Sequence, residues 1–591
     1  MTTRWTEAAM KMTTPFPDYP RPQLQRDNWM NLNGKWDYVG GKNVTDVITA
    51  KEAPSFTNAE KITVPYPPES YVSGIERKQE INMWYRRTFA LPSSWKKERI
   101  LLNFGAVDFY AVVFINGKKA GTHEGGYDAF SFDITSLLKE GDNTIVVGAQ
   151  DKNDGHSPSG KNEAGQYGDY IFTSGIWQTV WIEPVAENYI SSVKLTPDVA
   201  NKKLHVQVAS NADGVSISAV ASGKNVSTVT ASGTANQTFD INIDNPQLWS
   251  PDNPFLYDLK IQLKDKSGKI ADEVISYFGM RSVSLGEVAG VKRAMLNNKF
   301  LLQLGLLDQG YWPEGAYTAP TDDALKSDIE MAKRAGFNLI RKHMKTEPQR
   351  WYYYCDKMGM LVWQDMPCVW HPNDKDSVVV RNRHRGEWKE IIDEHYNSPS
   401  IVTWVPFNEN WGAFDIKNIT DWTKKYDPTR LVNGNTGFNN LPPKQTNIGD
   451  PGNGDFVDVH IYVGPYGASV PDGKRAASLG EFGGVGLFVR DHLYPVANNA
   501  YDMMPTSEDL TNRYVLLLNQ VEQLVKYKGL SIAIYTQTSD VEHEINGLLT
   551  YDREVEKMDF KRVADINTAV INSSKQLNES TDDKSTEKKK Q

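Results

Sequence analysis

The sequence predicts two β-sandwich domains followed by a (β/α)8 barrel. Short strand-like runs separated by turn residues fill the first part of the chain, and after residue 283 apolar strands alternate with amphipathic helices. The chain of 591 residues also exceeds what one hydrophobic core usually supports. We expect domains at residues 1–185, 186–282 and 283–575, and a disordered tail at 576–591, which is rich in Ser, Thr, Asp and Lys.

The first two domains read as β-structure throughout. Strand-like runs occur at residues 84–89 and 111–115, and Asn116-Gly117 after the second run is a strong hairpin signal. Apolar and polar residues then alternate through much of 203–220, within a segment of the size of an immunoglobulin-like sandwich.

The barrel is predicted from repeated helix and strand units. Residues 322–336 begin with capping acids, carry apolar residues near helical spacing and end in Gly336. A short apolar strand follows at 337–341, and the cycle repeats with a helix at 351–359 and a strand at 360–365. About 290 residues of this texture fit a single barrel.

Composition excludes several classes of protein. The formal charge of -9 is small for this length and no long basic block precedes the tail, which argues against nucleic acid as the main partner. No run approaches the roughly 20 apolar residues of a membrane span. Cys355 and Cys368, the only cysteines, are expected to be free and buried. The 16 Trp and 27 Tyr suit sugar stacking, although core packing is the more common role for any one of them.

Two glutamates stand at the ends of predicted barrel strands. Glu409 closes the run 401–408 and Glu481 closes the run 476–480. Because side chains at the C-terminal ends of barrel strands share one face, two carboxylates would converge there. Such a pair suits cleavage of a glycosidic bond, one carboxyl acting as acid and the other as nucleophile. The ordinary alternative is that each is a solvated or helix-capping strand-end carboxylate.

Motifs in all three predicted domains resemble glycoside hydrolase family 2, the family of β-galactosidases, β-glucuronidases and β-mannosidases. The resemblance covers roughly residues 20–570 in family order, and it rests on residues 107–117, 125–130, 174–178, 248–251 and 278–281 and on the pairs Asn408-Glu409 and Gly480-Glu481. It implies that the first domain is a jelly-roll sugar-binding domain and that the second is immunoglobulin-like.

The resemblance also implies roles in a retaining mechanism. Glu409 would be the general acid/base and Glu481 the nucleophile, while Asn408 would bind the sugar 2-hydroxyl and Tyr462 would orient Glu481. The implied activity is that of an exo-β-glycosidase that hydrolyses terminal β-linked sugars, a β-galactoside or a β-uronide, without a cofactor or a metal.

Several segments depart from the family pattern. Residues 307–312 replace a His-Glu pair, residues 341–348 replace an Arg-x-Ser-His-Tyr-Pro segment, and 534–540 lack the usual strand-eight tryptophan. Asn546-Gly547-Leu548 stands where glucuronidases carry Asn-x-Lys. Neither galactosidase nor glucuronidase specificity can therefore be transferred directly.

One of these segments suggests an anionic substrate. Arg341, Lys342, His343 and Lys345 place up to four cationic groups beyond a predicted strand, where they could hold a uronate carboxylate or a sulfate. Alternatively, Arg341 supports Glu481 while the lysines are solvated or pair with acids such as Glu347.

Further substrate contacts are expected from the residues near other strand ends, which are Asp308, Trp312, Trp411 and Gln537. Trp363 and Trp370 also lie near predicted strand ends and could stack on sugar rings, although core packing is equally plausible for Trp363. His371, His384 and His395 lack the spacing of metal ligands on a helix and are expected to be structural.

The expected partners are chain ends of oligosaccharides or polysaccharides, with neither nucleic acid nor membrane, and self-association is left open. The residues at the start of the chain show no signal peptide; a trimmed mature form would be periplasmic. Two alternatives share the scaffold: a transglycosylase, and a carbohydrate-binding protein without catalysis.

Overall fold

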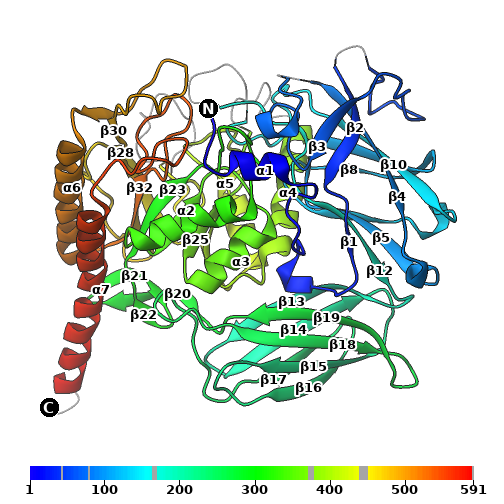
Figure 1. The fold of residues 1–591 in the computed structure, drawn as a ribbon. Helices are drawn as coiled ribbons and strands as arrows, with labels where there is room; N and C mark the ends of the chain where they lie inside the picture. Colours follow the sequence, from blue (N-terminus) through cyan, green and yellow to red (C-terminus); the bar gives the residue numbers. More distant parts are fainter. Residues whose placement is uncertain (42–43, 78–79, 163–169, 370–377, 438–449, 589–591) are drawn as a thin grey trace.

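A computed structural model describes residues 1–591 apart from 42–43, 78–79, 163–169, 370–377, 438–449 and 589–591, with side chains in the last helix as far as Glu579. Two β-sandwiches and a barrel follow one another along the chain (Figure 1), which confirms the predicted fold class. The first sandwich lies beside the barrel, and the second lies below both in this view.

The first sandwich is built from two antiparallel sheets. One has the order β3-β2-β4-β10-β7-β8 and the other the order β1-β12-β5-β9. Their bounds are β1 Met30–Asn31, β2 Gly34–Gly40, β3 Glu60–Val64, β4 Asn82–Ala90, β5 Arg99–Phe104, β7 Tyr110–Ile115, β8 Lys118–Glu124, β9 Phe130–Asp133, β10 Asp142–Gln150 and β12 Val180–Val185. Asn116 and Gly117, at φ +52° and +79°, form the tight turn between β7 and β8.

The second sandwich has seven strands, the number of a constant-type immunoglobulin domain. Its sheets have the orders β13-β14-β17 and β16-β15-β18-β19. The bounds are β13 Ile190–Asp198, β14 Lys203–Ser210, β15 Ser216–Ser222, β16 Val229–Thr234, β17 Thr238–Asn242, β18 Tyr257–Lys264 and β19 Ile270–Phe278. Alternating residues of these strands bury their apolar side chains between the sheets.

The barrel contains eight parallel strands in the order β27-β26-β25-β24-β23-β32-β29-β28. β23, the first of them along the chain, pairs with β32, the last. Their bounds are β23 Gln303–Asp308, β24 Leu339–Lys342, β25 Leu361–Asp365, β26 Ile401–Val405, β27 Leu431–Val432, β28 Phe456–Tyr462, β29 Ala476–Gly483 and β32 Leu530–Thr536. The hairpin of β20 Val283–Val288 and β21 Val291–Leu296 precedes them. Strict alternation fails between β28 and β29, where residues 463–475 contain no helix.

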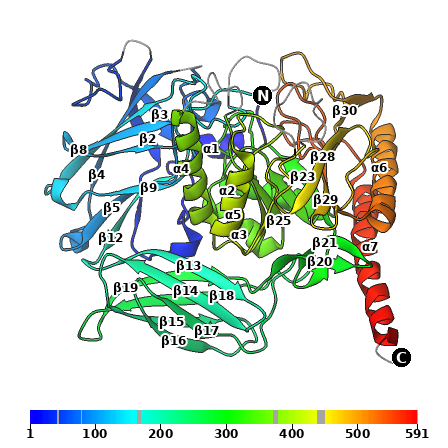
Figure 2. The ribbon, with the colours of Figure 1, turned by 180° about the vertical axis from the view of Figure 1, so that it is seen from behind.

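Helices surround the barrel, as seen from both sides in Figures 1 and 2. They are α2 Asp322–Arg334, α3 Gln349–Met358, α4 Val378–His395, α5 Ile416–Tyr426, α6 Ser507–Lys528 and α7 Phe560–Lys588. No helix among the described residues is both long and apolar enough to cross a membrane. Where the sequence predicted a disordered tail from residue 576, α7 continues to Lys588, and the Asn578 side chain donates to the Phe300 carbonyl at 2.9 Å.

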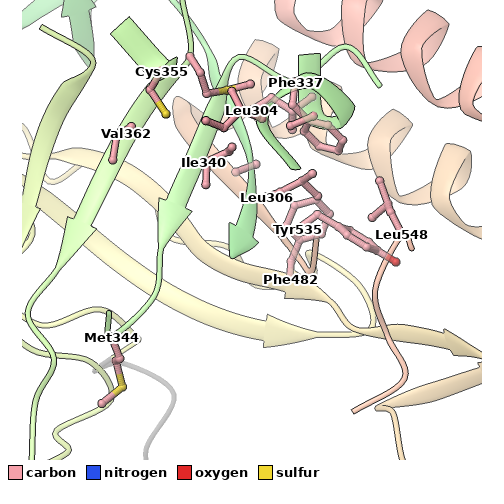
Figure 3. Packing of buried hydrophobic residues seen from close by; sticks show 14 of the residues in the cluster. Leu304, Leu306, Phe337, Ile340, Met344, Cys355, Val362, Phe482, Tyr535 and Leu548 are labelled. Atoms are coloured by element: carbon pink, nitrogen blue, oxygen red, sulfur yellow. The ribbon is translucent and has the colours of Figure 1, made fainter. Parts of the chain in front are cut away.

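Strand residues face two different cores. Leu304, Leu306 and Ile340 pack with Phe482 and Tyr535 in the layer between strands and helices (Figure 3). Neighbouring residues such as Leu307, Leu339 and Trp363 belong to a separate cluster inside the barrel. Successive residues of β23 and β24 therefore point alternately outward and inward.

The immunoglobulin-like domain is joined to the barrel by Trp249, between β17 and β18, and by Arg281, which follows β19. The buried Arg281 guanidinium donates to the carbonyls of Pro399, Ile401 and Thr429 at 3.1 to 3.2 Å. Trp249 Nε1 donates to the Asp356 carbonyl at 2.8 Å. The motif residues at 248–251 and 278–281 thus serve as structural joints.

The first domain is joined to helix α4. The backbone N–H groups of Gly126 and Tyr127 donate to Glu387 Oε1 at 2.7 and 2.8 Å, and Trp177 Nε1 donates to the Gly126 carbonyl. A Cβ on Gly126 would lie 2.6 Å from Asp108 Oδ1, so the close approach requires glycine.

Replacing Arg281 with Met should destabilise the protein by about 2–4 kcal/mol, because three hydrogen bonds would be lost and the buried Pro399 carbonyl would lose its side-chain donor. Calorimetric unfolding would show the lower midpoint. Arg99→Met is the matched control, since Arg99 is 39% exposed in its ion pair with Asp133 and should shift the midpoint little. Equal effects of the two substitutions would contradict a role for Arg281 at this joint.

Candidate active site

Glu409 and Glu481 both lie at the C-terminal end of the barrel. Glu409 follows β26 in a tight turn, where its φ is +47° and that of Asn410 is +62°. Two consecutive non-glycine residues in the left-handed region are uncommon and concentrate at functional sites. The turn is held by hydrogen bonds from Glu409 N to the Thr436 carbonyl and from Asn410 N to Asn435 Oδ1. Glu481 lies within β29.

The two carboxylates approach each other around a histidine. One ligand atom each of Glu409, His460 and Glu481 lies within 4.8 Å of the other two. His460 Nδ1 is 2.6 Å from Glu409 Oε1 and 3.5 Å from Glu481 Oε1. The Glu409 side chain is 23% exposed, whereas those of Glu481 and His460 are buried. Glu409 is therefore the carboxyl that solvent and a leaving group can reach.

Arg341 connects the base of the site. Its guanidinium, wholly buried, donates to both oxygens of Asp365 at 3.1 and 2.8 Å and to Glu481 Oε1 at 3.1 Å. It also donates to Asn408 Oδ1 at 2.7 Å. The arginine thus supports Glu481, which was one of the two interpretations of the sequence. It also fixes the position of Asn408.

Asn408 has a donor to spare. Its Oδ1 accepts from Arg341 and from Thr436 Oγ1, which sets the orientation of the amide. Its Nδ2 is buried and has no acceptor among the residues that the structure describes. A buried amide donor without a partner is costly, and a ligand hydroxyl would satisfy it.

Tyr462 contacts Glu481 from the other side. Its hydroxyl donates to Glu481 Oε2. The ring stacks face to face on Tyr501, with centroids 3.5 Å apart and planes 3° apart. Since Tyr501 is 56% exposed, an aromatic surface borders the nucleophile candidate on the solvent side.

The charges at the site shift its pKa values in opposite directions. Burial acts to raise the pKa of Glu409, but the hydrogen bond and positive charge of His460 outweigh it and lower that pKa. Burial acts to lower the pKa of His460, but Glu481, Glu409 and Asp458 outweigh it and raise that pKa. The two shifts therefore favour an ionised Glu409 beside a protonated His460.

These three groups also have the spacing of metal ligands. The Arg341 guanidinium already lies 3.1 Å from Glu481 Oε1, and His460 Nδ1 is engaged with Glu409. Both positions that a cation would need are thus close to positive charge, which favours proton chemistry at this site over metal binding.

The lysines of the basic segment do not face this site. Lys342 Nζ pairs with Asp308 Oδ2 at 2.8 Å and with Glu347 Oε1 at 2.9 Å, and its side chain is 1% exposed. Lys345 Nζ, equally buried, donates to Glu347 and to two backbone carbonyls. Burial lowers the pKa of Lys345 to about 8. The hypothesis that Lys342 and Lys345, and Asp308 beside them, contact substrate is therefore corrected: they form a closed charge cluster.

His343 and Trp411 lie nearer the catalytic candidates. His343 Nδ1 is 3.0 Å from Asp365 Oδ2, and its ring meets that of Trp411 edge on at 6.3 Å. Burial and Arg341 hold the pKa of His343 well below its usual range. Lys161, from the first domain, lies over the Trp411 ring at 5.8 Å, and its charge helps to lower the pKa of Glu409. The first domain therefore contributes to this end of the barrel.

Gln537 and Trp312, two further predicted substrate contacts, have partners within the protein. Gln537 Nε2 donates to Asn546 Oδ1 at 2.7 Å and to Glu544 Oε2 at 3.0 Å. Trp312 is buried, packs edge on against Trp5, and carries Arg553 over its ring at 4.2 Å. Trp312 thus has packing contacts on its ring in the structure, and its contact with a sugar stays a prediction.

The remaining candidates are structural. Cys355 and Cys368 are free and buried, as predicted. Burial lowers the pKa of His384 to about 4 and that of His395 to about 3, so both are neutral core residues. Trp363 donates to Gln303 from inside the barrel. Trp370 and His371 lie outside the described residues.

The sequence interpretation missed His460. It occupies the same face of β28 as Asp458 and Tyr462, since alternate strand residues share a face. Once Tyr462 had been assigned to the site, strand periodicity alone would have placed His460 on the same face of the strand. Lys161 gave no comparable signal, because it belongs to a loop of another domain.

Three family models match consecutive parts of the chain. "Glycosyl hydrolases family 2, sugar binding domain" matches residues 47–183, "Glycosyl hydrolases family 2" matches 176–281, and "Glycosyl hydrolases family 2, TIM barrel domain" matches 292–442. The chain belongs to glycoside hydrolase family 2. The barrel match includes Glu409 and ends before Glu481.

Curated relatives in family 2 differ in name. A putative β-glucuronidase of Formosa agariphila is 29% identical over 412 residues, covering 67% of this chain and 48% of that protein. A β-galactosidase of Thermoanaerobacter pseudethanolicus is 26% identical over 424 residues, covering 68% and 55%. The chain thus spans about half the length of these relatives.

Solved structures of family 2 share the fold. The β-glucuronidase of Ruminococcus gnavus in complex with D-glucuronic acid superposes with a TM-score of 0.75 at 19% identity, covering 93% of this chain and 99% of that one. The β-glucuronidase of Bifidobacterium dentium complexed with coumarin-3-O-glucuronide gives 0.74 at 19%, covering 92% and 98%.

Replacing Lys342 with Met should cost about 3–5 kcal/mol of stability, because Asp308 and Glu347 would be left buried without this cation. Adding Asp308→Asn should recover part of the loss in thermal unfolding. Lys326→Met is the matched control, since Lys326 is 35% exposed in its ion pair with Glu330. Unchanged stability of Lys342→Met would reopen a role for this lysine in binding.

Proposed function

We propose that this protein is a retaining exo-β-glycosidase that hydrolyses terminal β-linked sugars of glycans. The observation that carries the proposal is the approach of Glu409 and Glu481, whose facing carboxylate oxygens are no more than 4.8 Å apart. Carboxyl groups about 5 Å apart suit direct attack on the anomeric carbon, whereas inverting enzymes leave room for a water molecule between substrate and base.

Glu481 is the nucleophile of the first step. Arg341 donates a hydrogen bond to one of its oxygens and Tyr462 to the other, which fixes the orientation of the carboxylate before the reaction. A Glu481 oxygen forms a bond to the anomeric carbon while the bond to the glycosidic oxygen breaks. Glu409, the more exposed carboxyl, gives its proton to that departing oxygen.

Glu409 reverses its role in the second step. As a carboxylate it takes a proton from water, and the water oxygen attacks the anomeric carbon. The bond to Glu481 breaks, the nucleophile regains its charge beside Arg341, and the proton that Glu409 took from water replaces the one given to the leaving group. Each group returns to its starting state, and the configuration at the anomeric carbon is retained.

Asn408 stabilises charge that develops on the sugar. With its oxygen fixed by Arg341 and Thr436, its unpartnered Nδ2 can donate to the sugar 2-hydroxyl. Hydrogen bonds to this hydroxyl strengthen in the oxocarbenium-like transition state. A binding protein without catalysis would gain nothing from this arrangement beside two opposed carboxylates.

Restriction to chain ends is supported by the first domain. Gly160 N donates to the Cys368 carbonyl, Ile171 N donates to Glu542 Oε1, and Lys161 lies over Trp411. These contacts bring one side of the first domain against the loops at the C-terminal face of the barrel. Trp411 and Tyr501 offer aromatic faces on which sugar rings can stack.

The identity of the sugar is tested by initial rates on aryl β-glycosides: galactoside, glucoside, mannoside, fucoside, arabinoside, glucuronide and galacturonide. We expect hydrolysis of at least one, in line with relatives named β-galactosidase and β-glucuronidase. Since Lys342 and Lys345 are neutralised inside the fold, a uronide preference would have to come from other groups. Silence on all seven from folded protein would overturn the proposed function.

The two glutamates should respond differently to substitution. Glu481→Gln should abolish hydrolysis of every substrate, because no glycosyl-enzyme can form. Glu409→Ala should lower the rate on a substrate with a poor leaving group by about 10²–10⁴-fold, and far less where the leaving group needs no proton. Rates on 2,4-dinitrophenyl and alkyl glycosides of the preferred sugar would measure this. Equal losses on both would contradict the acid role of Glu409.

A further inference from the structure

His460 is the group that touches both catalytic carboxylates. Its Nδ1 lies 2.6 Å from Glu409 and 3.5 Å from Glu481, and its side chain is 1% exposed. Its Nε2 is 3.6 Å from Asp458 Oδ1, too far for a hydrogen bond, and makes no other bond among the described residues. Nδ1 therefore has a short bond to the acid/base candidate and no equally close competitor.

Charged groups from several strands surround this imidazole. The carboxylates near it are Glu409 after β26, Asp458 on β28, Glu481 on β29 and Asp365 on β25, and the basic groups are Arg341 on β24 and His343 after it. Arg341 is committed to Asp365 and Glu481. His460 is consequently the basic group that is hydrogen-bonded to the carboxylate of Glu409, while Lys161 acts on it by its charge.

We propose that His460 and Glu409 act as one unit that holds a single proton, and that this shared proton is the one delivered to the leaving group. The proposal rests on the proposed function and assigns to His460 a part in proton transfer that no retaining pair of carboxylates requires by itself. In the resting enzyme the proton is on His460 Nδ1, hydrogen-bonded to the Glu409 carboxylate.

The transfer is balanced in protons and charge. As the glycosidic bond breaks, the single proton moves from His460 Nδ1 to Glu409 and from Glu409 to the glycosidic oxygen. This leaves His460 neutral and Glu409 ionised. Glu481 loses its charge on forming the glycosyl-enzyme, so the unit does not face two uncompensated carboxylates. When water attacks, its proton passes to Glu409 and restores the protonated unit.

The pH dependence of this unit differs from that of a lone carboxyl. With the charged His460 beside it, the Glu409 carboxyl loses its own proton at low pH. The unit keeps one proton until the pH passes the raised pKa of His460. Its singly protonated form, which is competent for acid catalysis, is therefore present between the lowered pKa of Glu409 and the raised pKa of His460, and it is lost as the pH rises through the pKa of His460.

The first test is the pH profile of kcat/KM in His460→Asn. Asparagine can still donate to Glu409 from the position of Nδ1 but supplies no proton. We expect the basic limb to move down by about two pH units, the difference between the ordinary pKa values of an imidazole and a glutamate carboxyl. The rate loss should be confined to substrates with poor leaving groups. His205→Asn, at a 36% exposed histidine of the immunoglobulin-like domain, is the control.

An unchanged basic limb in an active His460→Asn variant would overturn the proposal, since a purely positioning role is retained by asparagine. A general loss on all substrates with the wild-type profile would do the same. Wild-type inactivity on every glycoside would instead count against the proposed function, which keeps the two failures apart.

The second test needs no turnover. Histidine-selective ¹⁵N NMR titration of the free protein, with the His460 signal assigned by its loss in His460→Asn, reports the imidazole pKa directly. In Glu409→Gln we expect that pKa to fall by about one unit or more, because one carboxylate charge at hydrogen-bond distance is removed. A His460 pKa that is the same in both proteins would overturn the shared proton.

Discussion

The geometry of the site depends on the hydrogen bonds of one buried group, the guanidinium of Arg341. It bonds to side chains or backbone from the ends of β25, β26 and β29, so a single group from β24 fixes the relative positions of Asp365, Asn408 and Glu481. A charge removed so completely from water is tolerated only because two carboxylates and several hydrogen bonds compensate it. The geometry of the nucleophile is therefore set by the barrel frame, and a planar fork with five donors suits this role in a way that lysine does not.

Charge balance explains why a histidine lies between the two glutamates. Four carboxylates, Glu409, Glu481, Asp365 and Asp458, lie around two compensating cations, Arg341 and His460. Arg341 is shared by Asp365 and Glu481, whereas Glu409 is bonded to His460 and also lies in the field of Lys161. Because like charges at short range disfavour ionisation, a site with both glutamates ionised needs a second cation. A histidine supplies one that can also lose its proton during the reaction.

Strand-end position and strand alternation carried most of what the sequence could predict. Glu409 and Glu481 were found because polar residues end apolar runs, and the three-part fold followed from a change in periodicity. Alternation would also have shown that Lys342 cannot face the same side as Arg341, its neighbour on β24, and that His460 must accompany Tyr462. Gln537 and Trp312 were beyond this reasoning, since the partners Glu544 and Trp5 come from irregular segments whose course no local pattern fixes.

The family motifs of the two β-domains join these domains to the barrel at a distance from the catalytic glutamates. Arg281 and Trp249 bond to backbone carbonyls at the barrel, and Gly126 with Tyr127 binds Glu387 on α4. These joints hold the first domain so that Lys161 and its neighbours reach the loops beside Glu409. Because Lys161 lowers the pKa of the acid/base, the position of a non-catalytic domain enters the proton balance of the barrel. The sandwiches are thus part of the electrostatic environment of the site as well as its frame.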